Sequence, residues 1–251
     1  MNQLALLVAL PLITAFLLPV INRVSSVAAR WTGPVVLVIS SAIGISLWHQ
    51  LGDSAISVEL GGFRPPLGIN LYADRLALLF ALAVTIGTLL LWPGEAENKI
   101  RQSTLALILA ASGSGLALSG DLFNIYVFYE LVAVASYGLI AARSTADSFA
   151  ATIRYLIISS FGAALALIGI ALIYQATGTL NLAQLAQLAP THLDNLQGLT
   201  AFVLLLIGFG VKAELFPVNT WVPEVYATAP TRVSGLLAGV ISKLALLIIL
   251  R

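Results

Sequence analysis

The chain of 251 residues contains no cysteine and only two histidines, and 9% of its residues are charged. Without cysteine it cannot form a disulfide, a thiolate metal site or a cysteine-held iron–sulfur cluster of its own. It contains no phosphate loop, dinucleotide fingerprint, histidine metal pair or nucleophile elbow, so we expect no cofactor and no metal. The net charge of +1 is not gathered into a basic run, which argues against nucleic acid as a partner.

Apolar residues dominate the chain: 59% are hydrophobic and the mean hydropathy is +1.00. A helix needs about 20 apolar residues to cross a bilayer. Eight segments meet or approach that length, which predicts an all-α, polytopic transmembrane helix bundle. The predicted spans lie near residues 3–21, 33–51, 74–92, 103–119, 121–141, 153–175, 199–220 and 231–250.

Two connections are predicted to have structure of their own. Residues 56–74 alternate apolar and polar side chains around a Gly/Pro-rich middle, which is typical of a short hairpin. Residues 179–189 place leucines on one face behind Asn181, which predicts a short interfacial helix capped by that residue. Asp121 is expected to cap the span that follows it.

The basic residues predict the orientation, because cytoplasmic loops are enriched in lysine and arginine. The N-terminus is therefore expected outside. One side of the predicted bundle has Arg23, Arg30, Lys99, Arg101, Arg143, Arg154 and Arg232, and the other has Arg64, Arg75 and Arg251.

Three charged residues fall inside predicted spans: Glu130, Lys212 and Lys243. A charge at the bilayer centre costs roughly 2.5 to 3.5 kcal/mol on insertion scales, so each should face protein or water instead of lipid. From their positions along the predicted spans, Glu130 and Lys243 are both expected near the middle of the membrane. We interpret all three as proton carriers. The alternatives are a glutamate that only fixes helix packing and lysines that snorkel to the surface.

Pro217 falls inside the predicted span 199–220, shortly after Lys212. Proline removes a backbone hydrogen bond, which predicts a broken helix, and transporters use broken helices beside buried charges. Glu214 is on nearly the opposite face from Lys212 and is expected to pair elsewhere, as a secondary site. At about 4 Å and an effective dielectric near 20, a Glu/Lys pair gains about 4 kcal/mol, enough to decide whether a buried lysine keeps its proton.

Three blocks carry a resemblance to a known family: GDLFNIYVFYELVAVASYGLI (120–140), residues 153–182 with RYLI and YQATGTLNL, and KAELFPVNTWVPEVYATAPTRVSGLLAGVISK (212–243). The chain resembles the antiporter-like subunits shared by respiratory complex I, the multisubunit Mrp cation/proton antiporters and membrane-bound hydrogenases. The stretch LGGFRPPLGINLYADRLALLF (60–80) looks more like the D-type Mrp subunits.

The resemblance implies that Glu130 and Lys212 are the paired carboxylate and lysine of a first half-channel. It also implies that Lys243 is the relay lysine beside them and that Pro217 marks the break in the seventh helix. Two positions depart from the family pattern. Asn219 stands where many relatives have histidine, and Arg154 where many have lysine. Because arginine stays charged, the second departure argues against a protonatable relay at that position.

Members of this family have an inverted pair of five-helix repeats, helices 4–8 and 9–13. On that pattern residues 1–251 form a single membrane domain, with three leading helices in 1–102 and the first repeat in 103–251. The second inverted repeat is absent from the sequence. We therefore expect the N-terminal half of a longer protein; the alternative is that a separate chain supplies the rest.

The resemblance implies a proton-conducting membrane subunit of a multisubunit Na⁺/H⁺ antiporter. One alternative is a proton-pumping translocase subunit of an NADH:quinone oxidoreductase-like or hydrogenase complex, in which other subunits carry out the redox chemistry. A second alternative is a scaffold subunit that has lost transport. The expected partners are other membrane subunits, the lipid bilayer, protons and Na⁺, in the inner (plasma) membrane of a bacterium or archaeon.

Overall fold

Helices account for most of the computed structural model, which describes residues 3–52, 55–63, 65–66, 68–93 and 99–251. Helices are expected in so apolar a chain, because they satisfy their own backbone donors and acceptors where water is absent. In chain order they are α1 (Gln3–Val24), α2 (Ser26–Gln50), α3 (Arg75–Leu90), α4 (Lys99–Leu118), α5 (Leu122–Ala141), α6 (Ala146–Thr177), α7 (Leu182–His192), α8 (Leu196–Gly210), α9 (Val222–Thr228), α10 (Thr231–Leu236), the π-helix η1 (Leu237–Ile241) and α11 (Ser242–Leu250).

Five helical stretches of the described residues are long and apolar enough to cross a membrane: α1, α2, α5, α6 and the continuous stretch Thr231–Leu250. Helices α3 and α8 are apolar but shorter. A multi-pass membrane protein is therefore confirmed, while the number of eight spans stays a prediction. Arg64, one of the residues on which the predicted orientation rests, lies outside the described residues, as does the side chain of Lys99.

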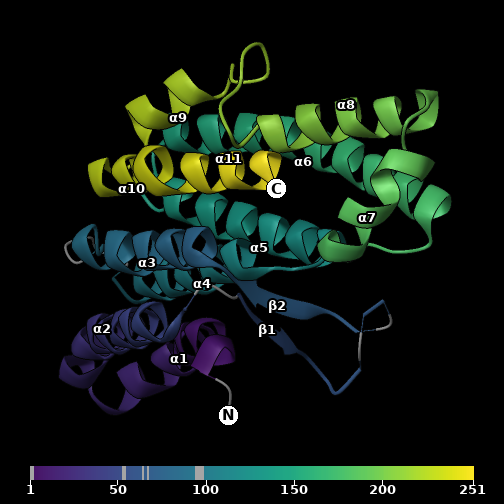
Figure 1. Ribbon diagram of the computed structural model, residues 1–251. Coiled ribbons are helices and arrows are strands. Elements are labelled where there is room, and N and C mark those ends of the chain that lie inside the picture. Colours follow the sequence, from purple (N-terminus) through teal and green to yellow (C-terminus); the bar gives the residue numbers. More distant parts are fainter. Residues whose placement is uncertain (1–2, 53–54, 64, 67, 94–98) are drawn as a thin grey trace.

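The predicted hairpin is confirmed. Strand β1 (Ile56–Glu59) pairs antiparallel with β2 (Asn70–Ala73), with Ile56 opposite Ala73 and Glu59 opposite Asn70. Among the named elements of the described residues, all but this two-stranded sheet are helices. Figure 1 shows the hairpin and α7 at one end of the bundle and α9 and α10 at the other.

Polar groups tie the hairpin end of the bundle together around Asn181. Its side-chain oxygen accepts a hydrogen bond from the Gln184 backbone, which confirms the predicted cap of α7. Its side-chain nitrogen donates to Asn70 Oδ1 at 3.1 Å and to the Gly120 carbonyl at 3.3 Å. One side chain therefore joins the hairpin, the turn between α4 and α5, and α7. Asp121 caps α5 through the Phe123 and Asn124 amides, as predicted.

Replacement of Asn181 is expected to be more damaging than loss of an ordinary helix cap. In Asn181→Ala, the cap and two buried long-range hydrogen bonds disappear, at about 1 kcal/mol each, so the free energy of unfolding should fall by roughly 3 kcal/mol. Thermal unfolding of the purified full-length protein measures the change.

Asn195→Ala is the matched control, because Asn195 caps α8 and otherwise makes only a local bond, to the His192 carbonyl. Equal destabilisation by the two variants would contradict a bridging role for Asn181.

Candidate functional site

Lys212 lies just beyond the end of α8 and is almost completely buried, with 2% of its surface exposed. Glycine residues allow the helices around Lys212 to approach one another closely. A Cβ added to Gly208 would come within 2.5 Å of the Gly162 carbonyl oxygen on α6, so the two backbones are in direct contact there. The Lys212 side chain is therefore held inside the bundle instead of at its surface.

Three helices supply the surroundings of the Lys212 ammonium. Its Nζ atom donates a hydrogen bond to Ser159 Oγ of α6 at 3.0 Å and lies 3.3 Å from the ring centroid of Tyr129 on α5. The Tyr129 hydroxyl donates to the Gly208 carbonyl at 2.7 Å, which fixes the ring under the charge. A cation over an aromatic face gains electrostatic stabilisation, most strongly where water is excluded.

Glu130 is the charged partner of this ammonium, but the two do not touch. Glu130 Oε1 lies 3.9 Å from Lys212 Nζ, beyond hydrogen-bonding distance. That oxygen is buried and has no hydrogen-bond partner among the described residues, while 34% of the Glu130 side chain is exposed. At this separation the Coulombic attraction is about 4 kcal/mol for an effective dielectric near 20, so a small displacement changes it appreciably.

Helix α8 ends earlier than the sequence predicts. The sequence predicts a helix over 199–220, but α8 ends at Gly210 and turns follow until Trp221. Glu214 has a left-handed φ of 60°, which no helix interior accommodates. The Trp221 indole donates to the Val211 carbonyl, which satisfies an acceptor that the missing helix leaves unpaired. Pro217 lies inside this turn segment, so its assigned role in the break stays a prediction.

Glu214 pairs away from Lys212, as expected. Its carboxylate accepts a hydrogen bond from the Tyr226 hydroxyl of α9. A series of aromatic contacts begins at Tyr226. Its ring meets Trp221 edge to face at 6.3 Å between ring centroids, and Trp221 stacks on Tyr155 at 4.0 Å. Tyr155 contacts Tyr137 at 5.0 Å.

The Tyr137 hydroxyl at the end of this series lies beside Ser159 and Ser160. Side chains therefore connect the Lys212 site with Glu214 through α5, α6 and α9. Apart from the family blocks in which they fall, these hydroxyl and aromatic residues carry no sequence signal, because serine and tyrosine in membrane helices are most often packing residues.

The expectation that Lys243 is buried is wrong for this chain. Lys243 is exposed, whereas its neighbours Ser242, Leu244 and Ala245 are buried. It makes no hydrogen bond or ion pair within the described part of the chain, and the structure does not bring it to Glu130 or Lys212. The position of a residue along a spanning helix predicts its depth in the membrane, but not the face of the helix that its side chain occupies. The relay role of Lys243 stays a prediction.

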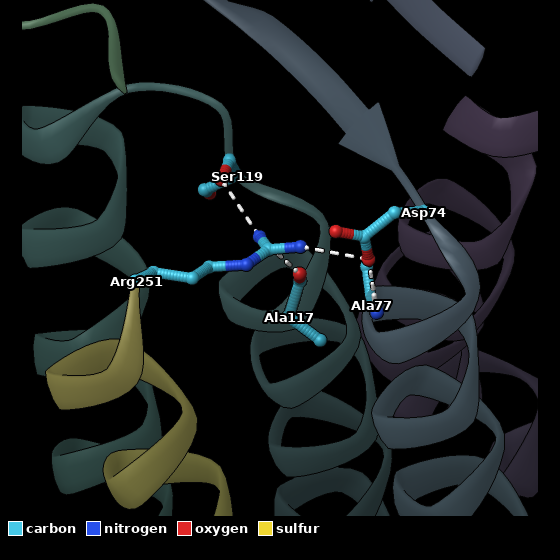
Figure 2. A network of polar contacts seen from close by, with 5 residues as sticks. All are labelled: Asp74, Ala77, Ala117, Ser119 and Arg251. Atoms are coloured by element: carbon cyan, nitrogen blue, oxygen red, sulfur yellow. Dashed lines mark hydrogen bonds and ion pairs between the residues drawn. The ribbon is translucent and has the colours of Figure 1, made fainter. Parts of the chain in front are cut away.

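Arg251, at the end of α11, holds that helix against α3 and α4. Figure 2 shows its guanidinium between the Ala117 and Ser119 carbonyls, at 3.0 and 3.3 Å, and the Asp74 carboxylate at 3.2 Å. Asp74 also caps α3 through the Ala77 amide. A cation at the carbonyl end of α4 is stabilised by the helix dipole. Across the described residues, no group of three or more His, Asp or Glu side chains is arranged to hold a metal ion.

Comparison with known proteins supports a common origin with membrane ion transporters. A family model described as NADH:quinone oxidoreductase/Mrp antiporter, TM, matches residues 119–251. Over its full length the chain is 34% identical to the D-type subunit of the Na(+)/H(+) antiporter of Bacillus subtilis, of which it covers 52%. The chain thus spans about half the length of the curated relatives it matches.

Solved structures show the same fold. A chain of the membrane-bound sulfane sulfur reductase, an archaeal respiratory membrane complex, matches with a TM-score of 0.93 and 33% identity, over 100% of this chain and 53% of that one. A chain of the Mrp complex from Dietzia sp. DQ12-45-1b matches with a TM-score of 0.86 and 28% identity, over 98% of this chain and 47% of that one.

Ser159 is expected to keep the Glu130–Lys212 pair apart. In Ser159→Ala the ammonium loses its hydroxyl acceptor, so we expect Nζ to close on Glu130 to about 2.7–2.9 Å, the length of a charge-assisted hydrogen bond. Cryo-electron microscopy of the full-length protein measures this distance.

Ser136→Ala is the control, since Ser136 is also buried but bonds only to the Val132 carbonyl of its own helix. A pair that stays at 3.9 Å in Ser159→Ala would show that Ser159 does not set the separation.

Proposed function

The chain belongs to the NADH:quinone oxidoreductase/Mrp antiporter transmembrane family, and from this membership we propose that it is a proton-conducting subunit of a multisubunit Na⁺/H⁺ antiporter. The family that the three sequence blocks resemble is thereby confirmed. The observation that carries the proposal is the buried ammonium of Lys212, which faces a carboxylate across 3.9 Å inside an apolar bundle. A structural ion pair would be expected to close to hydrogen-bonding contact, because closure repays desolvation.

In the proposed cycle, the Glu130–Lys212 distance controls the proton. When the pair closes, the carboxylate stabilises the charged ammonium. When it opens, Ser159 and the Tyr129 ring hold the ammonium alone, and a proton can leave for the next acceptor. Lys243 is the proposed next acceptor, and Glu214 with Tyr226 is a secondary site.

A redox-driven role is the second candidate, favoured by the TM-score of 0.93 to a chain of an archaeal respiratory membrane complex. In that case other subunits carry out the redox chemistry and move the same Glu130–Lys212 pair. The two candidates differ in what drives proton movement: a sodium gradient in the first, and electron transfer in the second.

Other membrane segments are proposed to cover the faces that carry Glu130 and Lys243. Lys243 is exposed and Glu130 is one-third exposed on this chain. A charge facing hydrocarbon costs roughly 2.5 to 3.5 kcal/mol, so protein or a water path is the favourable neighbour. By the positive-inside rule the arginine-rich end faces the cytoplasm and the N-terminus lies outside, in a bacterial or archaeal plasma membrane.

The proposal predicts that Glu130→Gln blocks transport. Glutamine keeps the shape but carries no charge and takes up no proton, so proton flux should fall on the order of a hundredfold. The assembled complex in sealed vesicles, with a pH-sensitive dye inside, is driven first by a sodium gradient and then by electron donors. Lys212→Ala should cause a comparable loss.

Glu224→Gln is the matched control, because Glu224 is also paired with a basic residue, Arg154, but both side chains are about half exposed at the end of the bundle. Full proton flux in Glu130→Gln and Lys212→Ala, with assembly intact, would contradict the relay hypothesis and favour the transport-inactive scaffold.

A further inference from the structure

Glu214 has a backbone conformation that a simple turn does not explain. It lies in the turn segment between α8 and α9 and has a left-handed φ of 60°. A residue with a Cβ is disfavoured in this region, whereas glycine adopts it without strain. Strained residues of this kind cluster at functional sites. A glutamate at a position that favours glycine therefore indicates that its carboxylate has a use.

The Glu214 carboxylate has a neutral partner and no basic one. The residue is half-buried, and its carboxylate accepts a hydrogen bond from the Tyr226 hydroxyl. No lysine or arginine among the described residues forms an ion pair with it. Glu224, by contrast, is paired with Arg154. A carboxylate without a fixed counter-charge can take up and release a proton without first breaking an ion pair.

Tyr226 connects this carboxylate to the arginine-rich end of the bundle. It is on α9, at the end opposite the hairpin in Figure 1. Two arginines hold that helix: Arg154 pairs with Glu224, and Arg143 donates a hydrogen bond to the Thr228 carbonyl. In the proposed orientation this end faces the cytoplasm.

The Tyr155 hydroxyl lies between Glu214 and the Lys212 site. Tyr155 is 1% exposed, and it interacts electrostatically with Glu214 and with Tyr137. The Tyr137 hydroxyl lies in turn beside Ser159, which accepts the hydrogen bond of the Lys212 ammonium. A hydroxyl both donates and accepts hydrogen bonds, so it can accept one proton while it releases its own. A series of hydroxyls therefore leads from the carboxylate to the ammonium.

We propose that Glu214 exchanges protons between the Lys212 site and the water at the arginine-rich end, through the hydroxyls of Tyr155, Tyr137 and Ser159. This inference rests on the proposed function and specifies one end of its proton route. In the inward direction the Glu214 carboxylate takes a proton from water and becomes a carboxylic acid. It passes that proton to Tyr155, each hydroxyl releases its own proton to the next, and a neutral Lys212 amine becomes the ammonium. The reverse sequence returns the proton to water.

Proton flux through the assembled complex, measured in sealed vesicles, tests this route. In Glu214→Gln the side-chain amide can still accept the hydrogen bond of Tyr226, but it takes up no proton. Flux should fall roughly tenfold, less than in Glu130→Gln, because water near the turn segment can replace part of the role of the carboxylate. Glu214→Asp keeps a carboxylate and should retain most of the flux.

Glu214→Gly separates the use of the side chain from folding. Glycine relieves the strained φ, which offsets the loss of the hydrogen bond to Tyr226. We therefore expect thermal unfolding within a few degrees of the parent protein, while proton flux falls as in Glu214→Gln.

Tyr155→Phe tests the hydroxyl series. The variant keeps the ring that stacks on Trp221 and removes only the hydroxyl, so flux should fall severalfold. Tyr174→Phe is the matched control, because Tyr174 is also on α6 but is 56% exposed and away from the series. It should transport as the parent does.

Carbodiimide labelling examines Glu214 without transport. A carbodiimide adds to a protonated carboxyl group, and mass spectrometry identifies the residue that carries the added mass. The complex is prepared in vesicles of the two opposite orientations, and a water-soluble carbodiimide that does not cross the membrane is added outside. Glu214 should be labelled where the arginine-rich end faces outward and not where the hairpin end does.

Three outcomes would overturn the proposal. Full flux in Glu214→Gln, with flux lost in Glu130→Gln, would leave the relay intact and remove Glu214 from it. Full flux in Tyr155→Phe would remove the hydroxyl series. Labelling of Glu214 only from the hairpin end would show that it meets water on the opposite side. Full flux in Glu130→Gln would instead contradict the proposed function itself, and this route with it.

Discussion

A lysine ammonium buried in an apolar bundle must receive all its electrostatic and hydrogen-bonding partners from protein or enclosed water, and the architecture around Lys212 follows from that requirement. Helices α5, α6 and α8 converge on it. The contact between Gly162 and Gly208 brings the backbones of α6 and α8 together, so that Ser159 reaches the ammonium. The Gly208 carbonyl in turn orients Tyr129 beneath the charge. The helix ends where the charge is held, and side chains from other segments satisfy the freed carbonyls.

Ser159 and Glu130 stabilise the Lys212 ammonium to comparable degrees, which suits proton transfer. A hydrogen bond to a charged group is worth about 1.5–3 kcal/mol, and the Coulombic attraction across 3.9 Å is about 4 kcal/mol at an effective dielectric near 20. Neither contribution dominates, so a displacement of about an ångström redistributes the stabilisation of the ammonium between Ser159 and Glu130. A closed, hydrogen-bonded pair would have fixed the charge in one place. In the open pair the position of Glu130 can change, and movements elsewhere in the protein can change it.

Local patterns in the sequence predicted the helical class, the hairpin and the caps of α5 and α7, because these depend on neighbouring residues. The Glu130–Lys212 pairing came from the family resemblance, and depth counted along the spans pointed to Glu130. Sequence reasoning failed where the outcome depends on backbone conformation and side-chain contacts that a helical pattern does not reveal. The early end of α8 depends on the left-handed Glu214 and on the Trp221–Val211 hydrogen bond. Ser159 was missed because nothing local marks a serine whose partner is on another helix. Depth along the last span was mistaken for burial of Lys243, whose helix face only the packing reveals.

The two ends of the stretch that carries Lys243 are anchored by different contacts. Arg251 fixes the end of α11 to the Ala117 and Ser119 carbonyls and Asp74, and Arg232 fixes the start of α10 to the Trp92 carbonyl. Between these anchors lies the π-helix η1, where a Cβ on Gly239 would meet nothing within 4 Å. A π-helical turn carries one extra residue, which rotates the helix faces that follow it relative to those that precede it. The exposed face on which Lys243 lies is therefore set by the extra residue of η1, within a stretch whose two ends are held by arginine contacts.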